Sequence, residues 1–303
     1  MLKLHSGEYA LGTPPGERSV KQLLEFGIIP IDKPRGPSSH EVSSLVRKLT
    51  GAPRTGHSGT LDPNVSGVLP VLLGKACKLA RLLTSSRKEY VCEATFQRPV
   101  THDELEGSLL YLQGEIYQTP PLQSAVKKAL RTRKVYELKL LEHDGNRALF
   151  RAGVQAGTYI RTLVRDAGII AGVEAHMSDL RRTIAAGIPL EKCVTLQEFS
   201  DRLWLWKERG EEKPLRKCLL PPESTVKLRK VIVGDETIRA IRLGSDVAAS
   251  AIDEIDDGLK EGSLAGVFTG RGELVAIARC LHDAGKVTEL AERERVLDIE
   301  RVF

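Results

Sequence analysis

The stretch Gly56-His-Ser-Gly-Thr-Leu-Asp-Pro-Asn-Val-Ser-Gly67 is the most distinctive part of this 303-residue chain. Its glycines and its proline predict a loop, because glycine adopts backbone conformations that other residues avoid and proline favours turns. Before the loop, apolar residues at helical spacing predict a helix that starts at Ser38-Ser39 and ends at Thr50-Gly51. After it, the apolar run over residues 69–83 predicts a second helix.

The loop does not match two common glycine motifs. A phosphate-binding P-loop needs G-x-x-x-x-G-K-[ST], whereas Gly67 and Gly74 are seven apart and Lys75 is followed by alanine. The nucleophile elbow of hydrolases needs G-x-S-x-G, but Thr60 stands where the last glycine belongs. The loop therefore indicates neither a nucleoside triphosphatase nor a serine hydrolase.

Asp62, in the middle of this loop, has two explanations. An aspartate before proline is a common turn former, which is a purely structural role. Alternatively, a carboxylate held beside an apolar helix with a cation next to it makes a positioned nucleophile or base. Arg161, in Gly157-Thr-Tyr-Ile-Arg161, is either that cation or one of several solvated arginines. The residues alone leave both explanations open.

The flanking segments predict an α/β (α+β) fold with a mixed sheet. Apolar or alternating patterns predict strands at residues 27–31, 88–97 and 148–155. The last of these runs into a strand-to-helix junction, where Thr158 is the expected N-cap of a helix that begins at Tyr159.

The C-terminal part has a different pattern. Residues 210–222 contain glycine, three prolines and many charges, and predict a domain boundary. Short β-type runs at 231–233, 264–268 and 274–278, separated by glycines, predict a small barrel-like β domain. We expect an N-terminal arm at 1–21 that packs on the C-terminal domain, a catalytic domain at 22–222 and a β domain at 228–303.

Charge is distributed unevenly along the chain. The net charge of +5 divides into +9 for residues 1–222 and −4 for residues 223–303. Basic clusters at 127–128, 131–134 and 181–182 lie in the positive part. Such clusters are typical of a solvated face, but their concentration here is equally consistent with nucleic-acid binding.

Other features exclude several classes of protein. The five cysteines are odd in number and widely spaced, with no C-x-x-C pair, which favours a reducing, cytoplasmic environment. The apolar runs are shorter than the roughly 20 residues that a membrane span needs. The histidines show no metal-ligand spacing beside cysteine, so we expect no metal.

Six motifs occur between about residues 27 and 185. They are Ile31-Asp-Lys-Pro34, Gly56-His-Ser-Gly-Thr-Leu-Asp-Pro63, Gly67-Val-Leu-Pro70, Lys88-Glu-Tyr90, Gly157-Thr-Tyr-Ile-Arg161 and Ala175-His-Met-Ser-Asp-Leu-Arg-Arg-Thr183. In these motifs the chain resembles the TruB/dyskerin family of RNA pseudouridine synthases. The stretch from Pro120 to Tyr136 looks like the archaeal and eukaryotic dyskerin branch, and the C-terminal segment resembles a PUA domain, an RNA-binding module.

The resemblance implies a role for each matching residue. Asp62 corresponds to the catalytic carboxylate, and Tyr90 to the tyrosine that stacks on the target base. Tyr159 and Arg161 match the residues that complete the pocket. Beside them, we expect His57 to help displace the nucleotide and Lys33 to support the loop.

The resemblance also implies the reaction and the partners. The expected activity is conversion of uridine in RNA to pseudouridine, without a metal or other cofactor. The expected substrates are the tRNA T-loop or rRNA selected by an H/ACA guide RNA. For the guided reaction we expect small accessory proteins as partners, and we expect no membrane association. A catalytically silent RNA-binding scaffold is the alternative from another class, which the joint presence of the four pocket residues opposes.

Overall fold

The structure is a computed structural model that describes residues 1–5, 7, 9–120 and 128–303. Residues 121–127 of the dyskerin-like stretch therefore lie outside the described residues. The chain forms two compact units. One contains Met1–Ile28, Leu73–Lys78 and Leu219–Phe303, and the other contains Ile29–Leu72 and Leu79–Cys218.

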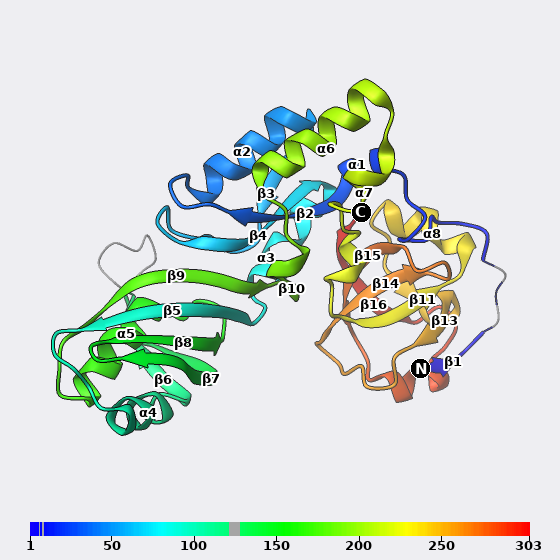
Figure 1. Cartoon of the computed structure of the whole chain (residues 1–303). Helices are drawn as coiled ribbons and strands as arrows, with labels where there is room; N and C mark the ends of the chain where they lie inside the picture. Colours follow the sequence, from blue (N-terminus) through cyan, green and yellow to red (C-terminus); the bar gives the residue numbers. More distant parts are fainter. Residues whose placement is uncertain (6, 8, 121–127) are drawn as a thin grey trace. The chain divides into compact units, whose positions relative to one another are not determined.

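The larger unit is built on a mixed sheet (Figure 1). Its strands, in spatial order, are β2 (Phe26–Lys33), β4 (Ser66–Gly74), β9 (Ala175–Ala185), β5 (Lys88–Phe96), β8 (Arg147–Val154), β7 (Arg131–Asp144) and β6 (Gly114–Gln118). Short strands β3 (Thr55–His57) and β10 (Ile188–Pro189) pair with β4 and β9. β4 and β9 pair in parallel, whereas the pairs β9–β5, β5–β8, β8–β7 and β7–β6 are antiparallel.

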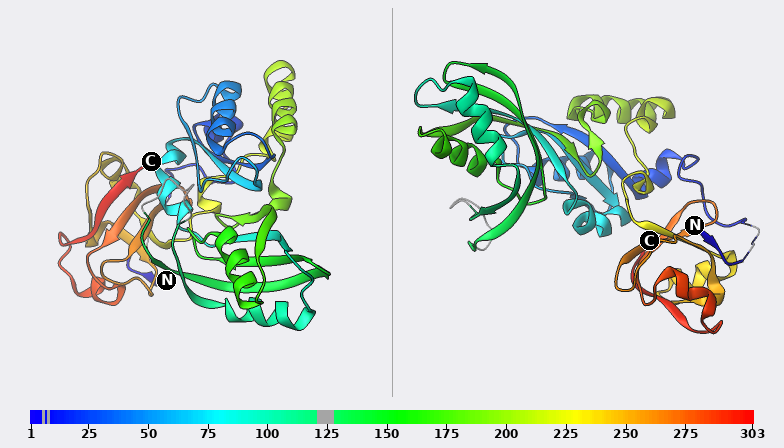
Figure 2. Two further views of the ribbon diagram at one scale, coloured as in Figure 1. Left: turned by 90° about the vertical axis from the view of Figure 1, so that its left-hand side faces the viewer. Right: turned by 90° about the horizontal axis from the view of Figure 1, so that it is seen from below.

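The larger unit also contains helices, which pack against the strands or against one another. They are α2 (Ser39–Thr50), α3 (Ala80–Thr84), α4 (His102–Tyr111), α5 (Ile160–Ile170), α6 (Leu196–Arg209) and α7 (Glu212–Arg216), with a 3₁₀ turn at Leu190–Lys192. Another 3₁₀ turn, at Lys75–Leu79, belongs to the smaller unit except for its last residue. α2 and α6 run side by side (Figure 2). α4 and α5 close the main core, in which Phe96, Phe150 and Leu163 are almost completely buried. Burial of these side chains from water is the main stabilising contribution.

The helix predicted between Ser38 and Gly51 is confirmed, and local capping explains its bounds. The Ser38 hydroxyl accepts a hydrogen bond from the backbone N–H of Glu41, and the Glu41 carboxylate accepts one from the backbone N–H of Ser38. Gly51 ends the helix in the left-handed conformation, at φ 71°. Both devices satisfy backbone groups that a helix end leaves without partners.

Two local predictions are wrong. Residues 69–74 belong to strand β4 and not to a helix, although a short helix follows at α3. The strand is buried from Ser66 to Leu73, so both of its faces are apolar and it lacks the alternation that distinguishes a strand from a buried helix. The N-cap of α5 is Tyr159 and not Thr158, whose hydroxyl instead donates to the Gln155 carbonyl.

The smaller unit contains a second mixed sheet. Its strands, in order, are β1 (Leu2–Lys3), β13 (Ile252–Ile255), β11 (Arg229–Val233), β14 (Leu264–Thr269), β15 (Leu274–Cys280), β16 (Arg295–Val302) and β12 (Val247–Ala248). The helices are α1 (Val20–Glu25) and α8 (Asp235–Arg242), with 3₁₀ turns at Pro222–Ser224, Ala249–Ala251 and Ala284–Glu289. Val231, Val267 and Leu297 are central to its separate core.

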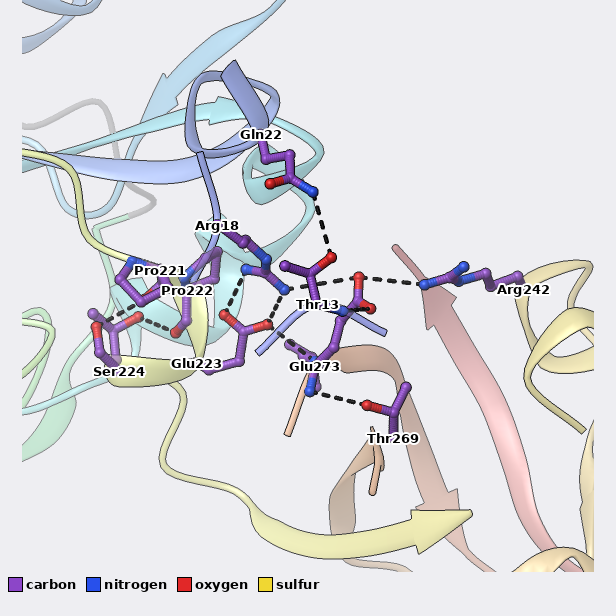
Figure 3. Close-up of polar contacts among 12 residues, drawn as sticks. Thr13, Arg18, Gln22, Pro221, Pro222, Glu223, Ser224, Arg242, Thr269 and Glu273 are labelled. Atoms are coloured by element: carbon purple, nitrogen blue, oxygen red, sulfur yellow. Dashed lines mark hydrogen bonds and ion pairs between the residues drawn. The ribbon is translucent and has the colours of Figure 1, made fainter. Parts of the chain in front are cut away.

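N-terminal residues make polar contacts within this smaller unit (Figure 3). The buried Arg18 forms a two-pronged ion pair with Glu223, at 2.9 Å and 2.7 Å. The backbone N–H of Thr13 donates to Glu273, which also pairs with Arg242. In neither unit is a described helix long and apolar enough to cross a membrane.

Candidate active site

The loop that carries Asp62 connects β3 to β4, and Ser39 fixes its centre. The backbone N–H of Leu61 donates to the Ser39 hydroxyl at 2.8 Å, and this hydroxyl donates to the Leu61 carbonyl at 3.0 Å. Both residues are buried, so water does not compete for these bonds. The residue before Asp62 is thus held on both sides of its backbone by the first turn of α2.

Lys33 holds the other side of Asp62. Its buried ammonium group donates to the carbonyl oxygens of Pro34 at 2.7 Å and Pro63 at 3.1 Å. Burial lowers the pKa of Lys33, and the carboxylate of Asp62 partly opposes this effect. The charge interaction indicates that the two groups are near each other, and the hydrogen bond to Pro63 supports the turn directly.

Arg182, on β9, anchors the loop and the strand that follows it through two backbone carbonyl groups. It is 1% exposed, and its guanidinium donates to the carbonyl of Val68 at 2.8 Å and to that of Gly59 at 2.9 Å. Gly59 has φ +86°, and a Cβ there would lie 3.4 Å from Nη1 of Arg182. Glycine at this position therefore permits the left-handed turn, and the arginine packs directly against it.

Arg161 reaches Asp62 from the first turn of α5. Its Nη2 lies 3.3 Å from Oδ2 of Asp62, and the two side chains are 45% and 65% exposed. Such an exposed pair contributes at most about 1 kcal/mol in water. Displacement of water by a bound ligand would strengthen it. The carboxylate is therefore both held by a cation and open to an incoming substrate.

Tyr159 is positioned through its backbone by Gln118, at the end of β6. The Tyr159 N–H donates to Gln118 Oε1 at 3.0 Å, and Gln118 Nε2 donates to the Tyr159 carbonyl at 3.2 Å. Gln118 is 2% exposed, so this amide is a rigid support. Because Arg161 follows two residues later, the same support orients the partner of Asp62.

Tyr90 and His57 are joined to the site less directly. Tyr90 is half-buried on β5, in register with Arg182 on β9, so its link to the Asp62 loop among the described contacts runs through that arginine. His57 is half-buried on β3, and its Nδ1 has no hydrogen-bond partner among the described residues. Burial and then the charge of Arg182 lower the pKa of His57, which makes the imidazole neutral near pH 7.

Three supporting residues were not singled out by the sequence: Ser39, Gln118 and Arg182. Ser39 was noted at a helix start, and Arg182 was noted in a basic pair and in the motif at residues 175–183, but neither was given a role. Their partners lie 22, 41 and 123 residues away along the chain. A local pattern carries no signal for such contacts. No group of three or more potential metal ligands occurs in the described part of the chain.

Family comparisons agree with this architecture. The description "TruB family pseudouridylate synthase (N terminal domain)" matches residues 47–160, and "tRNA pseudouridylate synthase B C-terminal domain" matches residues 161–227. A DKCLD (NUC011) domain matches residues 2–43 and a PUA domain matches residues 229–303. The chain belongs to the TruB family of pseudouridylate synthases, so it is an enzyme that isomerises uridine in RNA.

Two curated proteins are similar to this chain over nearly its whole length. The chain is 43% identical to the probable tRNA pseudouridine synthase B of Pyrobaculum aerophilum, over 96% of this chain and 87% of that protein. It is 41% identical to the protein of the same description from Archaeoglobus fulgidus, over 98% and 92%.

Two solved structures are similar over 99% of this chain. The "Crystal Structure of a Cbf5-Nop10-Gar1 Complex" has a TM-score of 0.91 at 40% identity and is covered over 91% of its chain. The "Structure of H/ACA RNP bound to a substrate RNA containing 2'-deoxyuridine" has a TM-score of 0.90 at 38% identity, with 92% covered. The predicted family and fold class are confirmed.

Proposed function

We propose that Asp62 is the nucleophile of the pseudouridine synthase reaction in this chain. The isomerisation breaks the N1–C1′ bond of uridine, turns the uracil and joins C5 to C1′. The proton lost from C5 is balanced by the proton gained at N1. Such a reaction needs one transient covalent bond and a site that retains the detached base. Attack on the uracil ring and attack at C1′ both use a carboxylate oxygen.

The observation that carries this proposal is the pairing of Asp62 with Arg161 on an immobilised loop. Ser39, Lys33 and Arg182 hold the backbone around Asp62, whereas its carboxylate is exposed. A fixed backbone with an accessible oxygen is the arrangement that a nucleophile needs, because orientation lowers the entropic part of the barrier. The cation keeps the carboxylate charged and oriented.

The two tyrosines complete the proposed site. Tyr90 stacks on the displaced base, and Tyr159 positions the base near the C5 proton. Extrusion of a base costs a few kcal/mol, and stacking on an aromatic ring returns about 1–3 kcal/mol. Tyr90 therefore offsets most of the cost. His57 occupies the vacated place in the RNA as a neutral wedge, which avoids attraction to the phosphates.

We infer that the substrates are the tRNA T-loop, rRNA selected by an H/ACA guide RNA, or both. Support for tRNA comes from the curated relatives, which are described as probable tRNA pseudouridine synthases B. Support for guided modification comes from the similar structures, whose titles include Nop10, Gar1 and a box H/ACA assembly. Small accessory proteins of that kind are the proposed partners, and rRNA processing in the cytoplasm is the proposed setting.

We also propose three functional segments: an arm at 1–21 on the C-terminal domain, a catalytic domain at 22–222 and an RNA-binding domain at 228–303. Support for the arm comes from the pairing of β1 with β13. The backbone N–H groups of Ala10 and Leu11 also donate to Asp235, at 2.6 Å and 2.8 Å.

The test is Asp62→Asn, assayed separately for pseudouridine formation and for RNA binding. We expect the rate to fall by at least about 10⁴-fold, while the dissociation constant for RNA changes little. Asp166→Asn is a matched control, because Asp166 pairs with Arg165 on α5. Conversion by Asp62→Asn near the wild-type rate would refute the mechanism. Lack of conversion by the wild type in tRNA and in the guided assembly would favour the RNA-binding scaffold.

A further inference from the structure

Arg133, on β7, lies against the turn that leads to Tyr159. A Cβ atom at Gly157 would be 3.3 Å from both Nε and Nη2 of Arg133. Gly157 has φ +80°, so the turn is tight and the guanidinium covers its backbone. Because Gly157 is two residues before Tyr159, this places a cation at the edge of the proposed base pocket.

The register of β6 and β7 shows which face of the sheet carries this arginine. Arg133 is opposite Ile116, and two residues further on Val135 is opposite Gly114. Val135 is in the buried core and Ile116 packs against it. Side chains two residues apart in a strand point to the same face. Arg133 therefore lies on the face that also carries Gln118 and, through it, Tyr159.

Among the residues that the structure describes, no carboxylate forms an ion pair with the guanidinium of Arg133. Nη1 donates to the neighbouring Thr132 carbonyl at 2.8 Å, and Nε is buried without a hydrogen-bond partner among the described residues. Arg151 differs in having a carboxylate partner, although its Nε is likewise buried without a hydrogen-bond partner among the described residues. It lies on the opposite face, between the core residues Phe150 and Ala152 of β8, and it pairs with Glu137 at 3.0 Å.

We propose that Arg133 binds a phosphodiester group of the RNA strand beside the target uridine. This inference rests on the proposed function, because it assigns an RNA contact to the same site. A guanidinium is planar and presents parallel N–H donors, which suits the oxygens of a phosphate. A phosphate contact beside the pocket would fix the strand while the base is rotated out, and it would be independent of sequence.

The test compares Arg133→Gln, Arg133→Lys and Arg151→Gln in the full chain, with an unmodified tRNA transcript as substrate. Arg151→Gln is the matched control, since it removes a half-buried arginine from the other face. Initial rates give KM and kcat. Filter binding in the Asp62→Asn background, over a range of salt concentrations, gives the dissociation constant and its salt dependence without turnover.

We expect Arg133→Gln to raise KM about tenfold at unchanged kcat, because a lost phosphate contact weakens binding uniformly. The slope of log K against log salt should decrease by about 0.7, the value for one phosphate on a single strand. Arg133→Lys should restore most of both, and Arg151→Gln should match the wild type.

Two results would overturn the proposal. One is a wild-type KM and salt slope for Arg133→Gln. The other is a lower kcat and melting temperature for both the Gln and Lys variants with the salt slope unchanged, which would mean that Arg133 only packs against Gly157. An inactive wild type would count against the proposed function instead, and the binding comparison would still test Arg133.

Discussion

Replacement of Lys88 by methionine should remove a pH dependence from the stability of the larger unit. Lys88 is 5% exposed, and its ammonium group donates to the carbonyl oxygens of Thr84 and Ser86. The charged neighbour that affects its titration is Arg182, which carries the same sign. Burial, with a smaller contribution from Arg182, lowers the pKa of Lys88 from 10.5 to about 8.

The size and sign follow from proton linkage. A pKa lowered by this amount means that the charged form is disfavoured in the folded state by about 3 kcal/mol. Below pH 8 this cost is fully present. Between pH 8 and 10.5 the unfolded chain binds a proton that the folded chain has lost, so the free energy of unfolding rises with pH. About 2.5 kcal/mol should be recovered between about pH 7 and pH 10.

The variant has two opposing effects at neutral pH. Lys88→Met removes the desolvated charge, but it leaves the carbonyl oxygens of Thr84 and Ser86 without their donor, at about 1–3 kcal/mol each. The absolute stability at pH 7 therefore does not separate the effect of the lost charge from the effect of the lost hydrogen bonds. The difference between wild type and variant as a function of pH does, because all other titrating groups are common to both proteins.

Urea unfolding provides the measurement. Both tryptophans of the chain, Trp204 and Trp206, are on α6 of the larger unit, so their fluorescence reports on this unit. The wild type should gain stability relative to Lys88→Met as the pH rises. Lys139→Met removes an exposed lysine on β7 and should give a flat difference. A flat difference for Lys88→Met would refute the reasoning.

Two further predictions test other supports. Ser39→Ala removes both hydrogen bonds to Leu61 and should lower kcat about tenfold, with a loss of about 1–3 kcal/mol in unfolding free energy. Kinetics and urea unfolding measure these effects, with Ser44→Ala on α2 as control; an unchanged kcat would show that this anchor does not position Asp62. Arg18→Met leaves the Glu223 carboxylate, whose side chain is 8% exposed, without its ion-pair partner and should destabilise the smaller unit by about 3–5 kcal/mol in calorimetry. Combination with Glu223→Gln should recover much of the loss, and a wild-type melting temperature for Arg18→Met alone would contradict this account.

Several local elements of the fold could be predicted from the sequence. The helix after Ser38 and the strands near residues 27–31, 88–97 and 148–155 occur close to their predicted bounds. Each depends on spacing or capping within a few residues. The error at residues 69–74 has a tertiary cause, because β4 is apolar on both faces and therefore shows no alternation.

The candidate site was predictable in its chemistry but only partly in its construction. The motifs identified Asp62, and a pairing with Arg161 was one of two explanations for that arginine. The expectation that Asp62 lies before an apolar helix is wrong, since the following element is a strand. Gln118 could not be found in advance, because its buried amide is explained only by the Tyr159 backbone.

The sequence alone determined the residue types of the proposed site, the local turns and caps, and the family, because these depend on short patterns that survive without a fold. Only the tertiary structure decided which distant side chains hold the Asp62 loop and which cations have no carboxylate beside them. Such contacts join segments up to 123 residues apart. They depend on strand register and burial, which no local pattern specifies.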